Sequence, residues 1–300
     1  MTAPFVTTHI TGGLGNQMFQ YAHGRALALR RGCPLFLDIE WFVRHEGGTP
    51  RKFALDVFPA LAQRSRVWQK CPSAQRNKLA YRPLWWKILA KAFSLKPQFK
   101  KEHVFEAEVH PYAEINYPKP AYLEGYWQDE RYFLEQVKQI REDFTFPALP
   151  AAAEDMARLI KASSHAVSVH IRRGDYAHNA STQSVHGLCS VVYYTQALEH
   201  IKQYAPHAEL FIFSDEPQWA RENFQTVGLQ STIVDLHQEN DAHHDMHLMS
   251  LCKDHIIANS SFSWWGAWLG EKGTVIAPKQ WFQAQNLKGC SPVPKRWITL

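Results

Sequence analysis

The chain has 300 residues, and its 33 basic and 28 acidic side chains leave a formal charge of +5. This length can bury a large core and suits two domains better than one. The slight basic excess fits a protein that handles anions and is too small to predict a nucleic-acid-binding protein.

The five cysteines are odd in number and have no C-x-x-C spacing. This pattern argues against a disulfide framework or a thiolate zinc site and indicates a reducing compartment. The first ten residues show no signal-peptide pattern, and no stretch approaches the ~20 apolar residues of a membrane-spanning helix. We therefore expect a cytoplasmic protein.

The amino-terminal part predicts a strand, a helix and a second strand. Residues 5–10 are typical of a strand, and a glycine-rich turn follows at residues 11–17. A helix is predicted from about Gln17 to Arg31, where two cations in its last turn and Gly32 just beyond mark its end. With a strand at residues 35–39, these elements make a βαβ unit.

Residues 64–101 contain eleven basic side chains and no acidic one. An apolar stripe recurs within them at helical spacing, through Tyr81, Trp85, Ile88 and Ala92. Lys87 and Lys91 lie on the other side, which predicts an amphipathic basic helix. Such a helix either covers a core with a solvated face or docks on an anionic membrane surface. The second alternative would place the protein peripherally on the inner face of the membrane.

Two prolines interrupt both periodicities at residues 144–150, which predicts a linker between domains at 1–146 and 151–300. Beyond the linker, strands and helical patterns alternate regularly, so a parallel sheet is expected. The predicted strands lie at residues 166–171, 209–213, 231–235, 255–258 and 274–277.

Residues 170–176, His-Ile-Arg-Arg-Gly-Asp-Tyr, directly follow an apolar strand pattern. Arginines at the end of a buried strand are costly to bury without partners, and the guanidinium fork suits phosphate. One interpretation is therefore an anionic ligand at the carboxyl end of the strand. The other is a surface turn in which Gly174 takes a positive φ and Asp175 pairs with an arginine.

The glycine turn at residues 12–15 resembles a dinucleotide fingerprint, but Met18 stands at the third glycine position and no Gly-Lys-Ser/Thr follows. Neither nicotinamide binding nor a Walker phosphate loop is predicted. The turn still directs backbone N–H groups and a positive helix end toward whatever lies there, and Asn16 adds a side-chain amide. A plain turn between strand and helix would use the same glycines.

Two later strand ends also carry polar side chains. Asp215 precedes Pro217, and it either caps the next helix or accepts hydrogen bonds from a nucleobase or ribose. The Asn-Ser-Ser-Phe-Ser run at residues 259–263 precedes an aromatic helix start. Its hydroxyl and N–H groups either cap that helix or bind a diphosphate.

No metal site is predicted. His243, His244, Asp245 and His247 have no ligand-type spacing, and the periodicity of their neighbours places them on or near an exposed turn. The sequence after the strand at 209–213 is Ser-Asp-Glu rather than Asp-x-Asp. We therefore expect neither a metal nor another cofactor.

Taken together, these motifs resemble the α-1,2-fucosyltransferases of bacteria and animals, glycosyltransferase family 11. The resemblance runs in one order from residue 8 to about residue 282. Several long motifs in series are a stronger signal than any one of them. They are residues 12–22, 125–128, 170–176, 213–216 and 246–269.

The resemblance implies a GT-B fold of two Rossmann-like domains with GDP-β-L-fucose in the cleft between them. The carboxy-terminal domain would bind the donor and the amino-terminal domain the acceptor. Arg172 would stabilise the charge that develops on the departing GDP, and His170 and Asp215 would recognise guanine. The implied donor-binding set is Gly13, Gly15, Asn16, His170, Arg172, Asp215, Asn259, Ser260, Ser261, Phe262 and Ser263.

The implied reaction moves L-fucose to the 2-hydroxyl of a terminal galactose with inversion and without a metal. A carboxylate base would help the attack in an oxocarbenium-like transition state. Asp175 is the carboxylate nearest to the phosphate motif, and pairing with Arg173 is its alternative role.

Two other functions stay open. One is a transferase of the same fold with another GDP-sugar or another fucosyl linkage. The other is a non-catalytic carbohydrate-binding module that uses tryptophans as stacking platforms. The sequence does not identify the acceptor beyond a galactose-terminated oligosaccharide or glycolipid.

Overall fold

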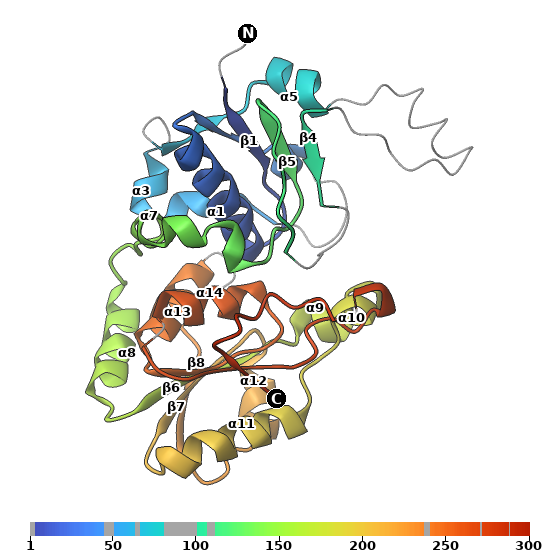
Figure 1. Ribbon diagram of the computed structural model, residues 1–300. Helices are drawn as coiled ribbons and strands as arrows, with labels where there is room; N and C mark the ends of the chain where they lie inside the picture. Colours follow the sequence, from blue (N-terminus) through green and yellow to red (C-terminus); the bar gives the residue numbers. More distant parts are fainter. Residues whose placement is uncertain are drawn as a thin grey trace. The chain divides into compact units, whose positions relative to one another are not determined.

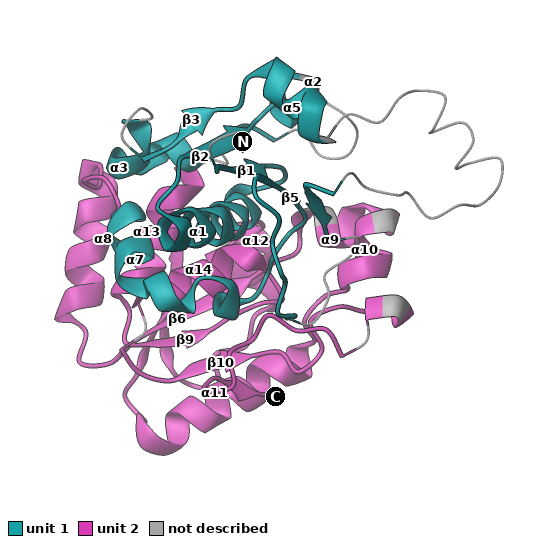
Figure 2. Ribbon diagram, turned by 45° about the horizontal axis from the view of Figure 1, so that its top comes forward, with its two compact units in different colours: residues 1–145 teal, residues 146–300 magenta. Residues whose placement is uncertain are grey.

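The structure is a computed structural model, and it describes residues 4–44, 51–63, 67–80, 101–106, 112–236, 241–270, 272–287 and 289–300. The chain divides into two compact units, Met1–Thr145 and Phe146–Leu300, which are coloured separately in Figure 2. The division falls within residues 144–150, where the prolines interrupt the sequence pattern. Most of the predicted basic helix, residues 81–100, lies outside the described residues, so its membrane docking stays a prediction.

The described residues of the first unit form a five-stranded sheet in the order β3-β2-β1-β5-β4 (Figure 1). Neighbouring strands are parallel, as expected of βαβ connections. In chain order the elements are β1 (Val6–His9), α1 (Leu14–Arg31), β2 (Leu35–Asp38), α2 (Trp41–Arg44), η1 (Leu55–Val57), α3 (Pro59–Ala62), β3 (Gln69–Lys70), α5 (Ser73–Ala80), β4 (His103–Phe105), β5 (Ala121–Glu124), η2 (Glu130–Tyr132), η3 (Leu134–Gln136) and α7 (Val137–Asp143).

Glycines mark both ends of α1. The helix begins at Leu14 rather than at the predicted Gln17, because Gly13 has an extended backbone (φ −76°, ψ 171°) and acts as the N-cap. It ends where predicted: Gly32 is left-handed (φ 57°), and its N–H donates to the carbonyls of Ala28 and Leu29. This is the usual way in which glycine terminates a helix.

The described residues of the second unit form a six-stranded sheet in the order β11-β10-β9-β6-β7-β8, again with parallel neighbours. The five strands predicted for this part of the chain are confirmed to within a residue or two at each end. In chain order the elements are α8 (Ala151–Ala162), β6 (Ala166–Ile171), α9 (Gly174–His178), α10 (Ala180–His186), α11 (Val191–Tyr204), β7 (Glu209–Ser214), α12 (Pro217–Asn223), β8 (Gln230–Val234), α13 (Ala242–Leu251), β9 (Asp254–Ile256), α14 (Ser261–Gly270), β10 (Val275–Ala277), η5 (Gln285–Leu287) and β11 (Ile298–Thr299).

Helices cover both faces of this second sheet. Leu210 and Ile212 of β7 pack into a core with α11, whereas Phe211 and Phe213 pack into a core with α8 and α13. Figure 1 shows α11 and α12 on one side of the sheet and α8 and α13 on the other. Because successive side chains of a strand point to opposite faces, an apolar run such as β7 is buried on both.

The tryptophans of α14 belong to the core. Trp264, Trp265 and Trp268 are 0%, 0% and 1% exposed, and the rings of Trp265 and Trp268 meet edge to face at 5.2 Å. Such edge-to-face pairs add to the stabilisation from burial. These three side chains are therefore not stacking platforms for a carbohydrate.

Each sheet has one point where the strand order reverses. In the first sheet the reversal lies between β1 and β5, and in the second it lies between β6 and β9. Open α/β sheets bind ligands outside the carboxyl ends of their strands at such switch points. The chain places four of the family motifs there: residues 12–17 and 125–128 in the first unit, and residues 170–176 and 259–263 in the second.

Candidate active site

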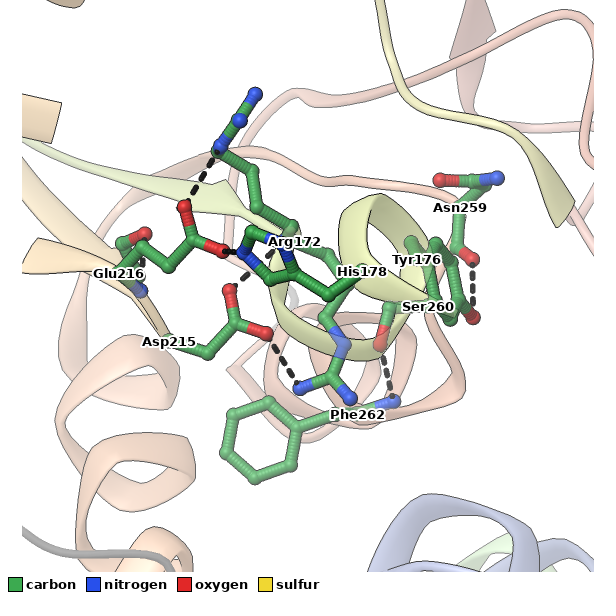
Figure 3. A network of polar contacts seen from close by, with 10 residues as sticks. Arg172, Tyr176, His178, Asp215, Glu216, Asn259, Ser260 and Phe262 are labelled. Atoms are coloured by element: carbon green, nitrogen blue, oxygen red, sulfur yellow. Dashed lines mark hydrogen bonds and ion pairs between the residues drawn. The ribbon is translucent and has the colours of Figure 1, made fainter. Parts of the chain in front are cut away.

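Two arginines follow β6 at the switch point of the second sheet. Arg172 Nη1 lies 2.9 Å from Asp215 Oδ2, and the backbone N–H of Arg173 donates to Asp215 Oδ1 at 2.8 Å. Figure 3 shows the Arg172 and Asp215 side chains facing one another. Asp215 therefore joins the ends of β6 and β7, so its predicted alternative role as a helix cap is wrong: α12 begins after Glu216 and has no side-chain cap among the described residues.

Gly174 is the first residue of α9, and the described residues with positive φ do not include it. The interpretation as a surface turn with a left-handed Gly174 is therefore wrong. A Cβ atom on Gly174 would lie 2.4 Å from Asp215 Oδ2. A larger residue here would therefore have to displace the Asp215 carboxylate.

Arg173 is held on two sides. Its Nε lies 3.0 Å from Glu216 Oε2, and its guanidinium carbon lies 3.9 Å from the centre of the Trp219 ring, a favourable cation–π contact. His178 Nε2 lies 2.9 Å from the other oxygen of Glu216. Arg173 therefore ties α9 to α12, which makes it a structural residue beside Arg172.

His170 is a buried, neutral side chain in the same place. Burial lowers its pKa to about 3, and the neighbouring charge of Arg172 lowers it as well. Its Nδ1 atom is buried and has no partner among the described residues, and its ring lies 5.7 Å from the ring of Phe262. A neutral imidazole nitrogen beside an aromatic ring suits hydrogen bonding to a planar base.

Burial raises the pKa of Asp215, while the charge of Arg172 and the N–H of Arg173 oppose that rise. The carboxylate and the Arg172 guanidinium therefore neutralise each other in part. A guanidinium carries five N–H donors. An anion that binds at Arg172 would share the guanidinium with Asp215. Asp215 would keep the guanidinium oriented.

Asn259 serves the fold. Its Nδ2 group donates to the carbonyls of His186 at 2.8 Å, Trp281 at 3.2 Å and Gly187 at 3.4 Å, and its Oδ1 accepts from the Cys189 thiol at 3.4 Å. This geometry gives the amide a structural role and does not support the predicted contact with the donor.

The serines that follow Asn259 differ in their contacts and exposure. Ser260 Oγ accepts from the Phe262 N–H at 3.3 Å and so caps α14. Ser263 is fully buried, and its hydroxyl contacts the carbonyls of Ala258 and Ser260 at 3.4 and 3.3 Å. Only Ser261 and Phe262 of the predicted set at this helix start are partly exposed, so these two are the better candidates for ligand contact.

The predicted residues of the first unit lie at the start of α1. Gly12 is left-handed (φ 76°), a Cβ atom on Gly13 would meet nothing within 4 Å, and Gly15 is buried in the first turn. Asn16 Oδ1 accepts from Gln128 Nε2 at 2.8 Å. The structure therefore brings two motifs together that are more than a hundred residues apart in the sequence.

Sequence reasoning missed Glu216, Trp219 and Glu106. Two arginines after one strand require two acceptors, and the Asp-Glu pair after β7 was the signal for Glu216. Glu106, whose carboxylate accepts the N–H groups of Tyr126 and Trp127, lies outside every motif and had no such signal. Asp175 lies in α9, but its side chain is outside the described part of the chain, so its role as a base stays a prediction.

Among the described residues, no three His, Cys, Asp or Glu side chains come together in a way that could hold a metal ion. The helical periodicity around residues 243–247 is confirmed, because these residues lie in α13, where His247 stacks on Phe146 at 4.6 Å. None of the described helices is both long and apolar enough to cross a membrane.

A cavity of about 220 Å³ lies beside Arg172 and Arg173. Its lining includes Tyr194 of α11, Trp219 of α12 and Phe224 directly after α12. Sites that enclose drug-sized ligands span about 300–1,000 Å³. The cavity is therefore too small for a whole nucleotide sugar, which would have to extend along the edge of the sheet.

Two relatives and one solved structure agree with this architecture. An α-1,2-colitosyltransferase of Escherichia coli is 34% identical over 98% of this chain and 98% of its own. A bovine galactoside 2-α-L-fucosyltransferase is 25% identical over 90% of this chain and 65% of its own. The crystal structure of the α-1,6-fucosyltransferase NodZ with GDP covers 90% of this chain and 93% of its own, with a TM-score of 0.51 at 15% identity.

The model of one protein family, glycosyl transferase family 11, matches residues 5–300. Its match spans both sheets and all four motifs at their switch points. The chain therefore belongs to glycosyl transferase family 11 and is a glycosyltransferase with the GT-B fold.

Proposed function

We propose that the protein is an inverting galactoside α-1,2-fucosyltransferase that moves L-fucose from GDP-β-L-fucose to the 2-hydroxyl of a terminal galactose. The observation that carries the proposal is the Arg172–Asp215 pair at the switch point, 2.9 Å apart, with the buried neutral His170 beside it. This arrangement offers a charged fork to a diphosphate and neutral polar groups to a base. It suits a nucleoside diphosphate sugar better than a free sugar.

The chemistry requires charge stabilisation at the leaving group. As the bond between fucose C1 and the β-phosphate oxygen breaks, negative charge grows on GDP. Arg172, held in place by Asp215, is the residue we assign to that charge, with Asn16, Gly13, Gly15 and the start of α14 in support. No metal or other cofactor takes part in this scheme.

The galactose 2-hydroxyl attacks from the face opposite GDP, which gives inversion. An oxocarbenium-like transition state makes few demands on the nucleophile, so a weak base suffices. Asp175 is our candidate for that base. The acceptor is a galactose-terminated oligosaccharide or glycolipid, and the basic residues 64–101 would bring the enzyme to the inner membrane face where a lipid-linked acceptor lies.

Product analysis tests the proposal. The protein is incubated with GDP-fucose and a panel of β-galactosides, and the products are examined by mass and by linkage analysis. We expect a deoxyhexose on galactose O2, and no product from the Arg172→Ala variant. A product linked elsewhere, or none from any galactoside, would refute the assigned reaction.

A second donor deserves the same test, because a relative 34% identical to this chain is an α-1,2-colitosyltransferase. Colitose is fucose without the 3-hydroxyl group. A site built to hydrogen-bond that hydroxyl rejects the deoxy sugar by about 10⁴-fold, whereas a site built for the deoxy sugar rejects the extra hydroxyl by only about 10²-fold. The ratio of kcat/KM for GDP-fucose and GDP-colitose therefore shows for which donor the site is built.

A further inference from the structure

Residues 125–128 form a tight turn after β5, at the switch point of the first sheet. Trp127 has a left-handed backbone (φ 54°), which a bulky residue keeps only where its surroundings hold it. Glu106, directly after β4, supplies that hold. Its Oε2 atom accepts the N–H of Tyr126 at 2.8 Å and that of Trp127 at 2.7 Å, and the side chain is buried, with 7% of the residue exposed.

The turn has little freedom around this carboxylate. A Cβ atom on Gly125 would lie 2.5 Å from the Cβ of Glu106, so the glycine is required for the two segments to pack. Gln20 of α1 donates to the Gly125 carbonyl at 3.1 Å. The turn is thus fixed from both β4 and α1.

The fixed turn presents Gln128 to Asn16. Gln128 Nε2 donates to Asn16 Oδ1 at 2.8 Å, which leaves the Asn16 Nδ2 group on the opposite side as a donor. Gly12 makes room for that group, because a Cβ atom there would lie 3.0 Å from it. The orientation of the Asn16 amide therefore depends on the turn, and the turn depends on Glu106.

We propose that Glu106 is a positioning residue for sugar transfer: it fixes the turn at residues 125–128 so that Gln128 orients the Asn16 amide toward the departing diphosphate. This inference rests on the proposed function, in which Asn16 contacts the donor. Glu106 itself touches no substrate. Glu106 supplies the turn with an acceptor oxygen between two N–H groups. A glutamine at this position would provide such an oxygen as well.

A double-mutant cycle tests the proposal. Asn16→Ala removes the donor and should lower kcat about a hundredfold. Glu106→Ala and Gln128→Ala should each lower kcat about tenfold or more in the wild-type background, with the acceptor KM within about twofold. In the Asn16→Ala background both should change kcat by less than about twofold, because they act only through Asn16. Glu106→Gln should stay within about threefold of wild type.

Asp143→Asn is the matched control. Asp143 is a buried carboxylate of the same unit that accepts from Tyr21 Oη at 2.7 Å and from Arg25 Nε at 2.9 Å. It is expected to lower stability and leave kcat unchanged in both backgrounds. Fold losses from Gln128→Ala and Asn16→Ala that multiply would overturn the proposal, as would full activity of Glu106→Ala. If Glu106→Ala does not fold, the Gln128 cycle and Glu106→Gln still decide.

A measurement without turnover separates this proposal from the proposed function. Burial raises the pKa of Glu106 to about 7, so the amide signals of Tyr126 and Trp127 should titrate near neutral pH in a nitrogen-15 NMR spectrum, and not in Glu106→Gln. Amide signals of Tyr126 and Trp127 that stay at their wild-type positions in Glu106→Ala would overturn the positioning role of Glu106. A titration in a protein that transfers no sugar would instead refute the proposed function alone.

Discussion

In the proposed reaction Arg172 interacts with two negatively charged groups, the Asp215 carboxylate and the diphosphate. The Asp215 carboxylate lies 2.9 Å from one guanidinium nitrogen in the structure, and the diphosphate would be the second partner. The carboxylate costs some of the positive potential at this point, but it fixes the direction of a flexible side chain before the ligand arrives. Preorganised donors of this kind account for much of the stabilisation of charged transition states.

Arg172→Ala is expected to lower kcat by a hundred- to thousandfold without unfolding the protein, the usual cost of losing one preorganised donor to a developing anion. Arg172→Lys should fail almost as badly, since an ammonium group cannot replace the planar fork. Steady-state kinetics and circular dichroism check both variants. Arg221→Ala is the control, because Arg221 forms an exposed pair with Asp235 in the same unit. A kcat of Arg172→Ala within tenfold of wild type would remove this residue from the mechanism.

The sequence predicted which segments carry the site but not how each side chain is used. Strand ends and motifs identified Arg172, Asp215 and residues 259–263. The sequence could not show that Gly174 is small to admit Asp215, or that the Asn259 amide is used up by three carbonyls. Those facts depend on distances between segments 22 to 73 residues apart, which a local periodicity cannot show.

At the scale of elements, the loop between β9 and α14 depends on Asn259. Its amide donates to carbonyls from two other loops, those of His186, Gly187 and Trp281. The Asn259 amide therefore helps to keep the serines at the start of α14 in place, because it holds the neighbouring loops.

The strand positions of the second unit were predicted well because buried parallel strands are continuous apolar runs. The short β3, β4 and β5 of the first unit have no such signal, and they were missed.

Asn259→Ala should lower the free energy of unfolding by at least about 2 kcal/mol, because buried carbonyls lose their donor. Urea unfolding followed by circular dichroism measures the change. Asn223→Ala is the control, since the side chain of exposed Asn223 donates to the Trp219 carbonyl within its own helix. A variant with wild-type stability but much weaker GDP affinity would return Asn259 to the donor-binding set.

At the scale of the whole molecule, the proposed mechanism assigns the charge on GDP to groups of the protein and none of it to a metal. Transfer should therefore continue at the same rate after dialysis against EDTA and in its presence. Assays with added Mg²⁺ or Mn²⁺ are the control and should match. Loss of activity on chelation, with recovery on adding either ion, would require a different assignment for Arg172.

The pH dependence of stability is also a property of the whole chain, because buried neutral histidines occur in both units. Burial is the main cause that lowers the pKa of His23 and His170 to about 3 and that of His255 to about 4. The unfolded chain binds these protons near pH 6.5, so the folded state is favoured above that pH and loses the advantage as the pH falls toward 3–4.

Between pH 7 and pH 5 each of these histidines should cost about 2 kcal/mol of stability, and the three together about 6 kcal/mol. Proton uptake by buried Glu106, whose pKa is raised to about 7, returns about 2 kcal/mol over the same range, so the net loss is about 4 kcal/mol. That loss is a large part of the stability of a typical domain, so the urea midpoint should fall over this range. His170→Asn should remove about half of the fall, because the fold then no longer excludes that proton. The exposed His207→Asn serves as the control. An identical fall in wild type and His170→Asn would show that His170 already carries its proton in the folded state, which would in turn remove the neutral imidazole from the proposed recognition of guanine.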